Sequence, residues 1–121
     1  MAKVLLADDS IEITDFLTVL LLINDFEVQN ARTESGIFEK LEQFKPDIIL
    51  MDVILKKSDG RKICKAIKEN PHYSRIPVLL LSASPDLLED FEAYKADGVL
   101  EKPFDIKMII DKINSYIKKD L

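Results

Sequence analysis

Short apolar segments alternate along this chain with longer segments whose apolar residues recur at helical spacing. Residues 4–7, 48–51 and 78–81 are continuous apolar runs, which is typical of strands buried on both faces of a sheet. Residues 26–31 are more polar and residues 98–100 form a short run, so we expect these two segments to be edge strands. The alternation predicts an α/β fold, a doubly wound parallel sheet of five strands with five helices.

The segments between the predicted strands carry the signals of helices. We expect the apolar stripe of the first helix to face the sheet, and it consists of Ile13, Phe16, Leu17, Leu20 and Ile23. The stripe of the last helix consists of Ile106, Ile109, Ile110, Ile113, Tyr116 and Ile117. The expected caps are Asp9 or Ser10 for the first helix, Thr33 for the second and Ser84 before Pro85 for the fourth, while Asn70-Pro71 ends the third.

Length and charge restrict the class of protein. The chain has 121 residues, which favours one domain, 1–121. Its 17 Lys and Arg against 22 Asp and Glu give a net charge of −5, which disfavours nucleic acid and polybasic membrane attachment. The apolar run 16–23 is too short to span a bilayer. Cys64 is the only cysteine, which excludes an internal disulfide, and we expect Cys64 to pack beside the core. These features predict a cytoplasmic protein.

Reactive side chains follow four of the five predicted strands. In chain order they are Asp8 and Asp9, Asp52, Ser82, and Lys102 after Glu101. Open parallel α/β sheets bind ligands beyond the carboxyl ends of their strands, so we expect these side chains to gather at one edge. An Asp or Ser at a strand end is also a common helix cap, and the joint arrangement at four strand ends is what favours a site.

The chemistry of these side chains points to a metal and a phosphate. Three carboxylates at one edge repel each other, which raises their pKa values unless a cation lies among them. Mg²⁺ suits such an oxygen-only site because it takes one or two carboxylates and leaves room for a phosphoryl group. Lys102 adds a positive charge and Ser82 a hydroxyl. The sequence therefore predicts an acidic, metal-binding pocket that can hold phosphate oxygens.

Four short motifs in this order and spacing give the chain its resemblance to a known family. The motifs are Leu6-Ala7-Asp8-Asp9-Ser10, Ile49-Leu50-Met51-Asp52 followed by Asp59-Gly60, Leu81-Ser82-Ala83 and Glu101-Lys102-Pro103-Phe104. With them the chain resembles the receiver domain of two-component response regulators, in particular the single-domain chemotaxis regulators. The resemblance covers essentially the whole chain, and it implies a flavodoxin-like fold with strand order 2-1-3-4-5.

The resemblance also implies a role for each site residue. It makes Asp52 the phosphoacceptor, Ser82 a phosphate-sensing hydroxyl and Lys102 a phosphate-pairing ammonium. The implied protein ligands of Mg²⁺ are Asp8, Asp9, Asp52 and the backbone carbonyl of Ile54. In this family the Lys-Pro bond is usually cis, so we expect a cis bond between Lys102 and Pro103.

The function implied is phosphorelay signalling. Asp52 would accept a phosphoryl group from a phosphohistidine of a sensor histidine kinase or a histidine phosphotransfer protein, in a Mg²⁺-dependent reaction. The chain would then act as a phosphoacceptor signalling domain and not as an enzyme with its own substrate. The only histidine, His72, lies in a predicted surface loop, so the donor belongs to a partner. The downstream target is a second protein, and a phosphorylation-dependent dimer through the fourth and fifth helices stays open.

Other interpretations fit the sequence less well or stay open. A haloacid dehalogenase-type phosphatase needs a second Asp two residues after its nucleophile, where this chain has Ile54. A flavodoxin must hold a phosphate dianion in its first loop, where Asp8 and Asp9 would repel it. Two alternatives remain: a receiver-like interaction module that works without phosphorylation, and the receiver part of a larger regulator with an output domain beyond Leu121.

Several positions depart from the usual family pattern. Val99 replaces the aromatic residue that usually couples to the site hydroxyl, so we expect switching to rely on the loop after Ser82 and the start of the fourth helix. Ile54 and Ser84 occupy positions that tune the lifetime of the phosphoryl group, and an apolar Ile54 predicts a persistent aspartyl phosphate.

Two further features concern the partner. Lys56 and Lys57 are either solvated loop residues or an attraction for a phosphorylated donor. Ile11 and Leu22 point away from the predicted stripe of the first helix, and the resemblance makes Ile11 a candidate contact for the donor.

Overall fold

Five parallel strands form the central sheet of the computed structural model, which describes residues 1–103 and 105–117. The strands are β1 (Lys3–Ala7), β2 (Glu27–Ala31), β3 (Ile48–Asp52), β6 (Val78–Ser82) and β7 (Gly98–Glu101). Their order in the sheet is β2-β1-β3-β6-β7, which is the predicted order 2-1-3-4-5 counted over these five strands. The edge strands are β2 and β7, as expected. Strand β2 begins one residue later than predicted, because the buried Phe26 instead donates its amide to the Leu21 carbonyl.

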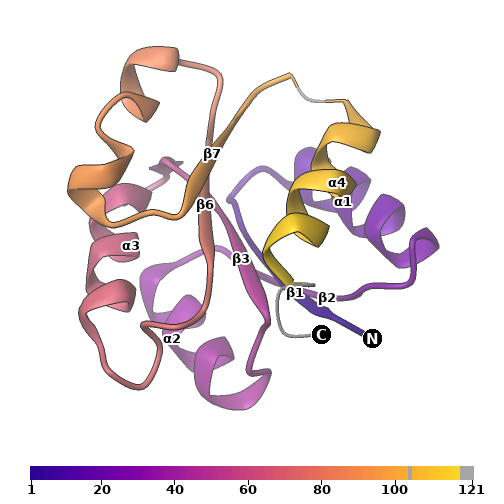
Figure 1. Ribbon diagram of the computed structural model, residues 1–121, viewed down its shortest axis with the longest axis horizontal. Coiled ribbons are helices and arrows are strands. Elements are labelled where there is room, and N and C mark those ends of the chain that lie inside the picture. Colours follow the sequence, from indigo (N-terminus) through magenta and orange to yellow (C-terminus); the bar gives the residue numbers. More distant parts are fainter. Residues whose placement is uncertain (104, 118–121) are drawn as a thin grey trace.

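Helices cover both faces of the sheet (Figure 1). Helices α1 (Ile11–Ile23) and α4 (Ile106–Ile117) cover one face. The other face is covered by α2 (Glu34–Gln43), α3 (Gly60–Glu69) and the 3-10 helices η1 (Pro85–Leu88) and η2 (Phe91–Tyr94). A small antiparallel hairpin of β4 (Ile54–Leu55) and β5 (Ser58–Asp59) joins β3 to α3.

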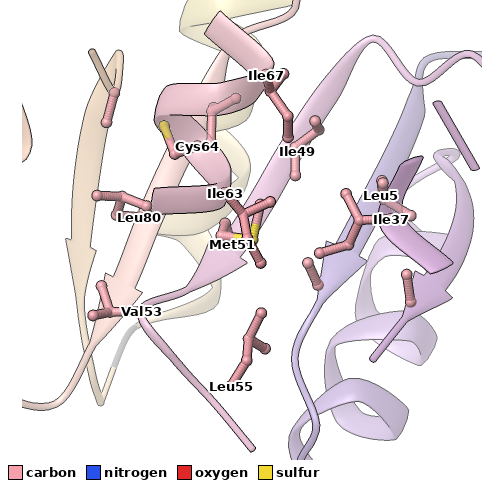
Figure 2. Packing of buried hydrophobic residues seen from close by; sticks show 14 of the residues in the cluster. Leu5, Ile37, Ile49, Met51, Val53, Leu55, Ile63, Cys64, Ile67 and Leu80 are labelled. Atoms are coloured by element: carbon pink, nitrogen blue, oxygen red, sulfur yellow. The ribbon is translucent and has the colours of Figure 1, made fainter. Parts of the chain in front are cut away.

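The alternation of side chains along each strand produces two hydrophobic clusters, one on each face of the sheet. In β3, Ile49 and Met51 belong to the cluster under α2 and α3, whereas Ile48 and Leu50 belong to the cluster under α1 and α4. Figure 2 shows Met51 of β3 beside Ile63 of α3, and both belong to the same cluster. Full burial of one such aliphatic side chain contributes roughly 1.5–3 kcal/mol. Cys64 is fully buried, as predicted, and burial raises the pKa of its thiol to about 12, so the thiol is not reactive.

Helix α1 faces the sheet with a different stripe from the predicted one. Its buried residues are Thr14, Leu17 and Leu21, whereas Phe16 is 56% exposed and Ile23 72% exposed. The prediction is confirmed for Leu17 and for Ile13, which packs against the cluster under α1, and it was wrong for Phe16 and Ile23. It failed there because α1 is apolar around most of its circumference, so the apolar residues alone do not define one face. A threonine at the centre of the buried face also gave no apolar signal. Its hydroxyl can be buried because it donates to the backbone carbonyls of Ser10 and Ile11.

The segment predicted as the fourth helix forms the two 3-10 helices η1 and η2. This segment contains four carboxylates: Asp86, Glu89, Asp90 and Glu92. In an α-helix they would form like-charge pairs at spacings of three and four residues, which destabilise a helix. Ser84 precedes η1, but its side chain makes no capping hydrogen bond, contrary to the prediction.

Other local predictions are confirmed. Ser10 and Thr33 cap α1 and α2, and α3 ends at Glu69 before Asn70-Pro71. In α4, Ile109 and Ile113 are buried as predicted, and Ile106 is the stripe residue that stays exposed. His72 is exposed in a loop. Phe104, the last residue of the fourth motif, lies outside the described residues. Within the described part of the chain, no helix combines the length and apolar composition needed to cross a bilayer.

Candidate functional site

The predicted site residues lie at the carboxyl ends of the central strands. Asp52 is the last residue of β3 and Ser82 the last residue of β6. Asp8 follows the end of β1 directly, and Lys102 follows the end of β7. Because these four strands are neighbours and parallel, their ends place the four side chains on one edge of the sheet. The peptide bond between Lys102 and Pro103 is cis, as predicted.

The ammonium group of Lys102 joins two of the carboxylates. Its Nζ lies 2.6 Å from Oδ2 of Asp52 and 3.4 Å from Oδ2 of Asp8. Asp8 is 2% exposed and Asp52 is 7% exposed, so both acidic groups are nearly removed from water. Burying two carboxylates is costly unless a cation and hydrogen bonds compensate for the lost hydration. Lys102 supplies that compensation from the opposite end of the sequence.

Backbone amides hold the remaining carboxylate oxygens. Oδ1 of Asp8 accepts from the Ser10 amide at 2.9 Å, and Oδ1 of Asp52 accepts from the Ile54 amide at 3.0 Å. Each of these amides lies two residues after its carboxylate, which is the geometry of an Asx turn. Each carboxylate therefore has one oxygen fixed by its own loop and the other oxygen directed at Lys102.

The pKa values reflect this crowding. Burial raises the pKa of Asp8 and the neighbouring Asp52 carboxylate raises it further, while the Ser10 amide and Lys102 act in the opposite direction. For Lys102, burial alone would lower the pKa, but the Asp52 and Asp8 carboxylates outweigh it and the pKa is raised. The site is therefore a pair of nearly buried carboxylates, and Lys102 is the one cation in the described residues that is paired with both.

We expect the change Asp8→Asn to stabilise the protein at neutral pH when divalent cations are absent. The raised pKa means that ionised Asp8 costs stability. That cost is absent below the ordinary aspartate pKa of about 3.9 and grows as the pH rises through the pKa of the folded state. An amide oxygen can still accept from Ser10, so we expect a gain of about 1 kcal/mol. Urea unfolding at neutral and acidic pH measures it. A variant less stable than wild type at neutral pH would contradict this interpretation.

Ser82 lies at the same edge, but its hydroxyl has a different partner. Its side chain is buried, its Oγ accepts from the Ser84 amide at 3.0 Å, and its carbonyl accepts from the Lys102 amide at 2.8 Å. The hydroxyl thus connects the end of β6 to the segment that leads into η1. Val99 is partly buried and packs against the hydrophobic cluster under α3, and strand β7, which carries Val99, contacts η1.

Asp9 is less buried than Asp8 and lies in different surroundings. It lines a cavity together with Arg32 and Lys56, outside the pair formed by Asp8 and Asp52. Within residues 1–103 and 105–117, Asp9 and the Ser82 hydroxyl share no hydrogen bond with Asp8, Asp52 or Lys102. In the same part of the chain, no three His, Cys, Asp or Glu side chains converge as a preformed metal cluster.

Gly60 supports the site in a way that the sequence motif alone did not reveal. A Cβ at this position would lie 1.9 Å from the backbone oxygen of Asp52. The Gly60 amide also donates to the Val53 carbonyl at 2.7 Å, and Asp59 caps α3 by accepting from the Arg61 amide. The dipeptide Asp59-Gly60 thus lets α3 begin directly against the end of β3. The sequence signal that could have indicated this close approach is the glycine that follows Asp59 soon after the end of a predicted strand.

The chain matches the family model described as response regulator receiver domain over residues 4–114. Among curated proteins, it is 32% identical to a CpxR homolog of Haemophilus influenzae, described as a transcriptional regulatory protein. That match covers 98% of this chain and 52% of the relative. A 27% identical relative is the DNA-binding dual master transcriptional regulator RpaA of Synechocystis, with coverage of 98% and 50%. The chain therefore spans about half the length of these relatives.

A solved structure resembles the chain over nearly its full length. The chemotaxis protein CheY4 of Vibrio cholerae is 30% identical, with a TM-score of 0.87. The similarity covers 96% of this chain and 98% of that one.

Proposed function

Because the chain belongs to the response regulator receiver domain family, we propose that Asp52 accepts a phosphoryl group and that the phosphorylated form signals by binding another protein. The observation that carries this proposal is the contact between Lys102 and Asp52, beside the carboxylate of Asp8. A nucleophilic carboxylate next to a fixed ammonium can attack a phosphorus atom while the ammonium balances the charge of the phosphate oxygens.

The reaction that we propose transfers the phosphoryl group between two proteins. An oxygen of Asp52 forms a bond to phosphorus as the bond from phosphorus to a donor imidazole nitrogen breaks, and the imidazole leaves the site. Lys102, which pairs with Asp52 beforehand, can turn to the phosphate oxygens without leaving the edge of the sheet. The Ser82 hydroxyl lies at the same edge and is a further donor to those oxygens. The chain acts here as a phosphoacceptor domain and not as an enzyme with its own substrate.

The donor set at this edge fits a hard divalent cation. The oxygens of Asp8, Asp9 and Asp52, with the backbone carbonyl of Ile54, are the ligand types that Mg²⁺ prefers. Asp8 and Asp52 are two nearly buried carboxylates that share the ammonium group of Lys102, so a further cation would reduce their repulsion. When bound, Mg²⁺ would neutralise charge on the transferring phosphoryl group. The residues that would hold it are the same four that the family resemblance implies.

The outer face of α1 supports docking of a helical donor. Four large apolar side chains are more than half exposed there besides Ile11, which is 54% exposed: Phe16, Val19, Leu22 and Ile23. Contiguous exposed apolar residues mark interaction sites. Ile11 lies three residues after Asp8, at the end of α1 next to the site. We propose that a sensor histidine kinase or histidine phosphotransfer protein packs its helices on this face, in the cytoplasm.

The alternative is that this sequence is the receiver part of a larger regulator. The coverage of about half of each curated relative favours this alternative, because those relatives are transcriptional regulators with additional sequence. In that case the phosphorylated receiver would act on an output domain of the same protein. The chemistry proposed for Asp52 is the same in both cases, and a phosphorylation-dependent dimer is compatible with either.

We expect phosphorylation by acetyl phosphate to require a divalent cation. The chain is incubated with acetyl phosphate and Mg²⁺, with and without an excess of EDTA, and its intact mass is measured. The expected result is one added phosphoryl group with Mg²⁺ and little or none with EDTA, because Lys102 alone leaves the acidic site with too little positive charge. Equal modification in both samples would refute the assignment of the metal.

A further inference from the structure

A cavity of about 490 Å³ opens beside the acidic site, between the loops that follow β1, β2 and β3. Asp9 and Ile11 line it from the first loop and helix α1. Arg32 lines it from the loop after β2, and Lys56 and Lys57 line it from the turn between β4 and β5. Three cations from two different loops thus surround one concave surface next to the proposed phosphoacceptor.

These three cations have no ion-pair partner in the part of the chain that the structure describes. Arg32, Lys56 and Lys57 are exposed, and none of them has an ion pair among residues 1–103 and 105–117. Other cations of the chain do have carboxylate partners, including Arg61, Lys68, Lys95 and Lys102. An adjoining cavity of about 300 Å³ shares Lys57 and is also lined by Lys62 and by Asp59, whose carboxylate is paired with Arg61.

The positive charge of Arg32, Lys56 and Lys57 contrasts with the charge of the rest of the molecule. The chain carries a net charge of −5, so its overall field repels anionic partners. The three unpaired cations outnumber the two carboxylates that line the same cavity, those of Asp9 and Glu34. A local positive patch on an acidic protein orients an approaching anionic group and disfavours partners with the opposite charge pattern.

The cavity also has apolar walls that continue onto the outer face of α1. Leu55 is buried at the cavity wall, and Ile11 is part of both the cavity and the exposed face of α1. A glutamate side chain suits this combination, because its methylene groups can lie on Ile11 while its carboxylate reaches the cations. The walls provide no buried, unpartnered polar group in the described residues, which a dedicated site for a small free anion would need.

We propose that this cavity is a docking site for glutamate or aspartate side chains of the phosphodonor protein. These acidic side chains would lie at the edge of the helices that pack on α1. This inference rests on the proposed function, since it assigns the partner of the same site. The acidic residues would contact Arg32, Lys56 and Lys57 while the phosphohistidine faces Asp52. The cavity thus contributes to the choice of donor, and the chemistry at Asp52 does not depend on it.

The probe is a synthetic peptide of leucines and paired glutamates, compared with the same peptide carrying glutamines. Binding is measured by titrating ¹⁵N-labelled protein and following the amide signals. We expect the acidic peptide to shift the signals of Arg32, Lys56 and Lys57, and the glutamine peptide to leave them unchanged. The shifts should weaken with added salt, because the contacts are between exposed charges.

Two triple variants test whether the acidic peptide binds at this cavity or is attracted only by the total positive charge of the protein. Changing Arg32, Lys56 and Lys57 to glutamine should weaken peptide binding about tenfold, because three exposed ion pairs are lost. The control changes Lys65, Arg75 and Lys107 to glutamine, which removes the same charge from exposed positions away from the cavity. Circular dichroism and thermal unfolding check that both variants fold. We expect the control to bind the acidic peptide as wild type does.

Three results would overturn the inference: equal binding of both peptides, equal weakening by both variants, or inorganic phosphate that shifts the same signals as strongly as the peptide. The last result would make the cavity a site for small anions. Labelling of wild-type protein by acetyl phosphate tests the proposed function separately. A chain that is labelled but does not bind the peptide refutes only the docking site. A chain that is not labelled refutes the proposed function.

Discussion

The change Gly60→Ala is expected to destabilise the protein by about 3 kcal/mol, the upper part of the range for overpacking a tight site. A Cβ at Gly60 would lie 1.9 Å from the backbone oxygen of Asp52 and 2.9 Å from its backbone carbon. Both atoms belong to the backbone, so no side-chain rotation can relieve the contact. Either α3 or the end of β3 must shift, and both elements are packed into the core. Chemical denaturation with urea measures the loss.

The control for this prediction is Gly36→Ala in α2. A Cβ there would meet only side-chain atoms, with the Thr33 hydroxyl at 3.1 Å and the Ala31 Cβ at 3.7 Å. Alanine is also the better helix former, so we expect little change or a small gain. A Gly60→Ala protein as stable as the Gly36→Ala protein would contradict the close approach of α3 to Asp52.

The change Lys102→Met is expected to lower stability by about 3 kcal/mol, because it leaves two nearly buried carboxylates without their cation. Methionine keeps most of the side-chain volume, so the loss reports charge and not packing. Thermal and urea unfolding measure it at neutral pH without divalent cations. The same variant should label poorly with acetyl phosphate, because Lys102 no longer balances the charge of the phosphate oxygens.

A double variant tests whether charge is the reason for this loss. Asp8→Asn removes one of the two carboxylates, so it should raise stability clearly more in the Lys102→Met background than the gain of about 1 kcal/mol expected in wild type. Such coupling between two changes is the signature of a direct interaction. Strictly additive effects of the two changes would contradict the pairing of Lys102 with Asp8.

The strand pattern allowed the sheet and the site to be predicted because both depend on short-range features. Continuous apolar runs identify buried strands, and a parallel sheet brings their carboxyl ends together. Asp8, Asp52 and Lys102 could therefore be placed together although they are far apart in the sequence. The cis bond before Pro103 and the strand order came from the family resemblance, because neither follows from periodicity.

The errors arose where tertiary packing or charge outweighs periodicity. Phe16 was assigned to the buried face of α1 because it is apolar, but the helix turns Thr14 inward instead. The acidic segment that contains Asp86 and Glu89 carries no signal that distinguishes an α-helix from 3-10 turns, except its like-charge spacing. Arg32 was not singled out at all, because its position beside Lys56 depends on two loops that are distant in the sequence.

The most direct test of the central claim is the mass of the intact chain after incubation with acetyl phosphate and Mg²⁺, for wild type and for Asp52→Asn. Asparagine has nearly the same shape but is not a nucleophile. We predict that the wild-type chain gains one phosphoryl group, that hydroxylamine removes it as expected for an acyl phosphate, and that Asp52→Asn gains none. Equal labelling of the two proteins, or no labelling of wild type, would contradict the assignment of Asp52 as the phosphoacceptor.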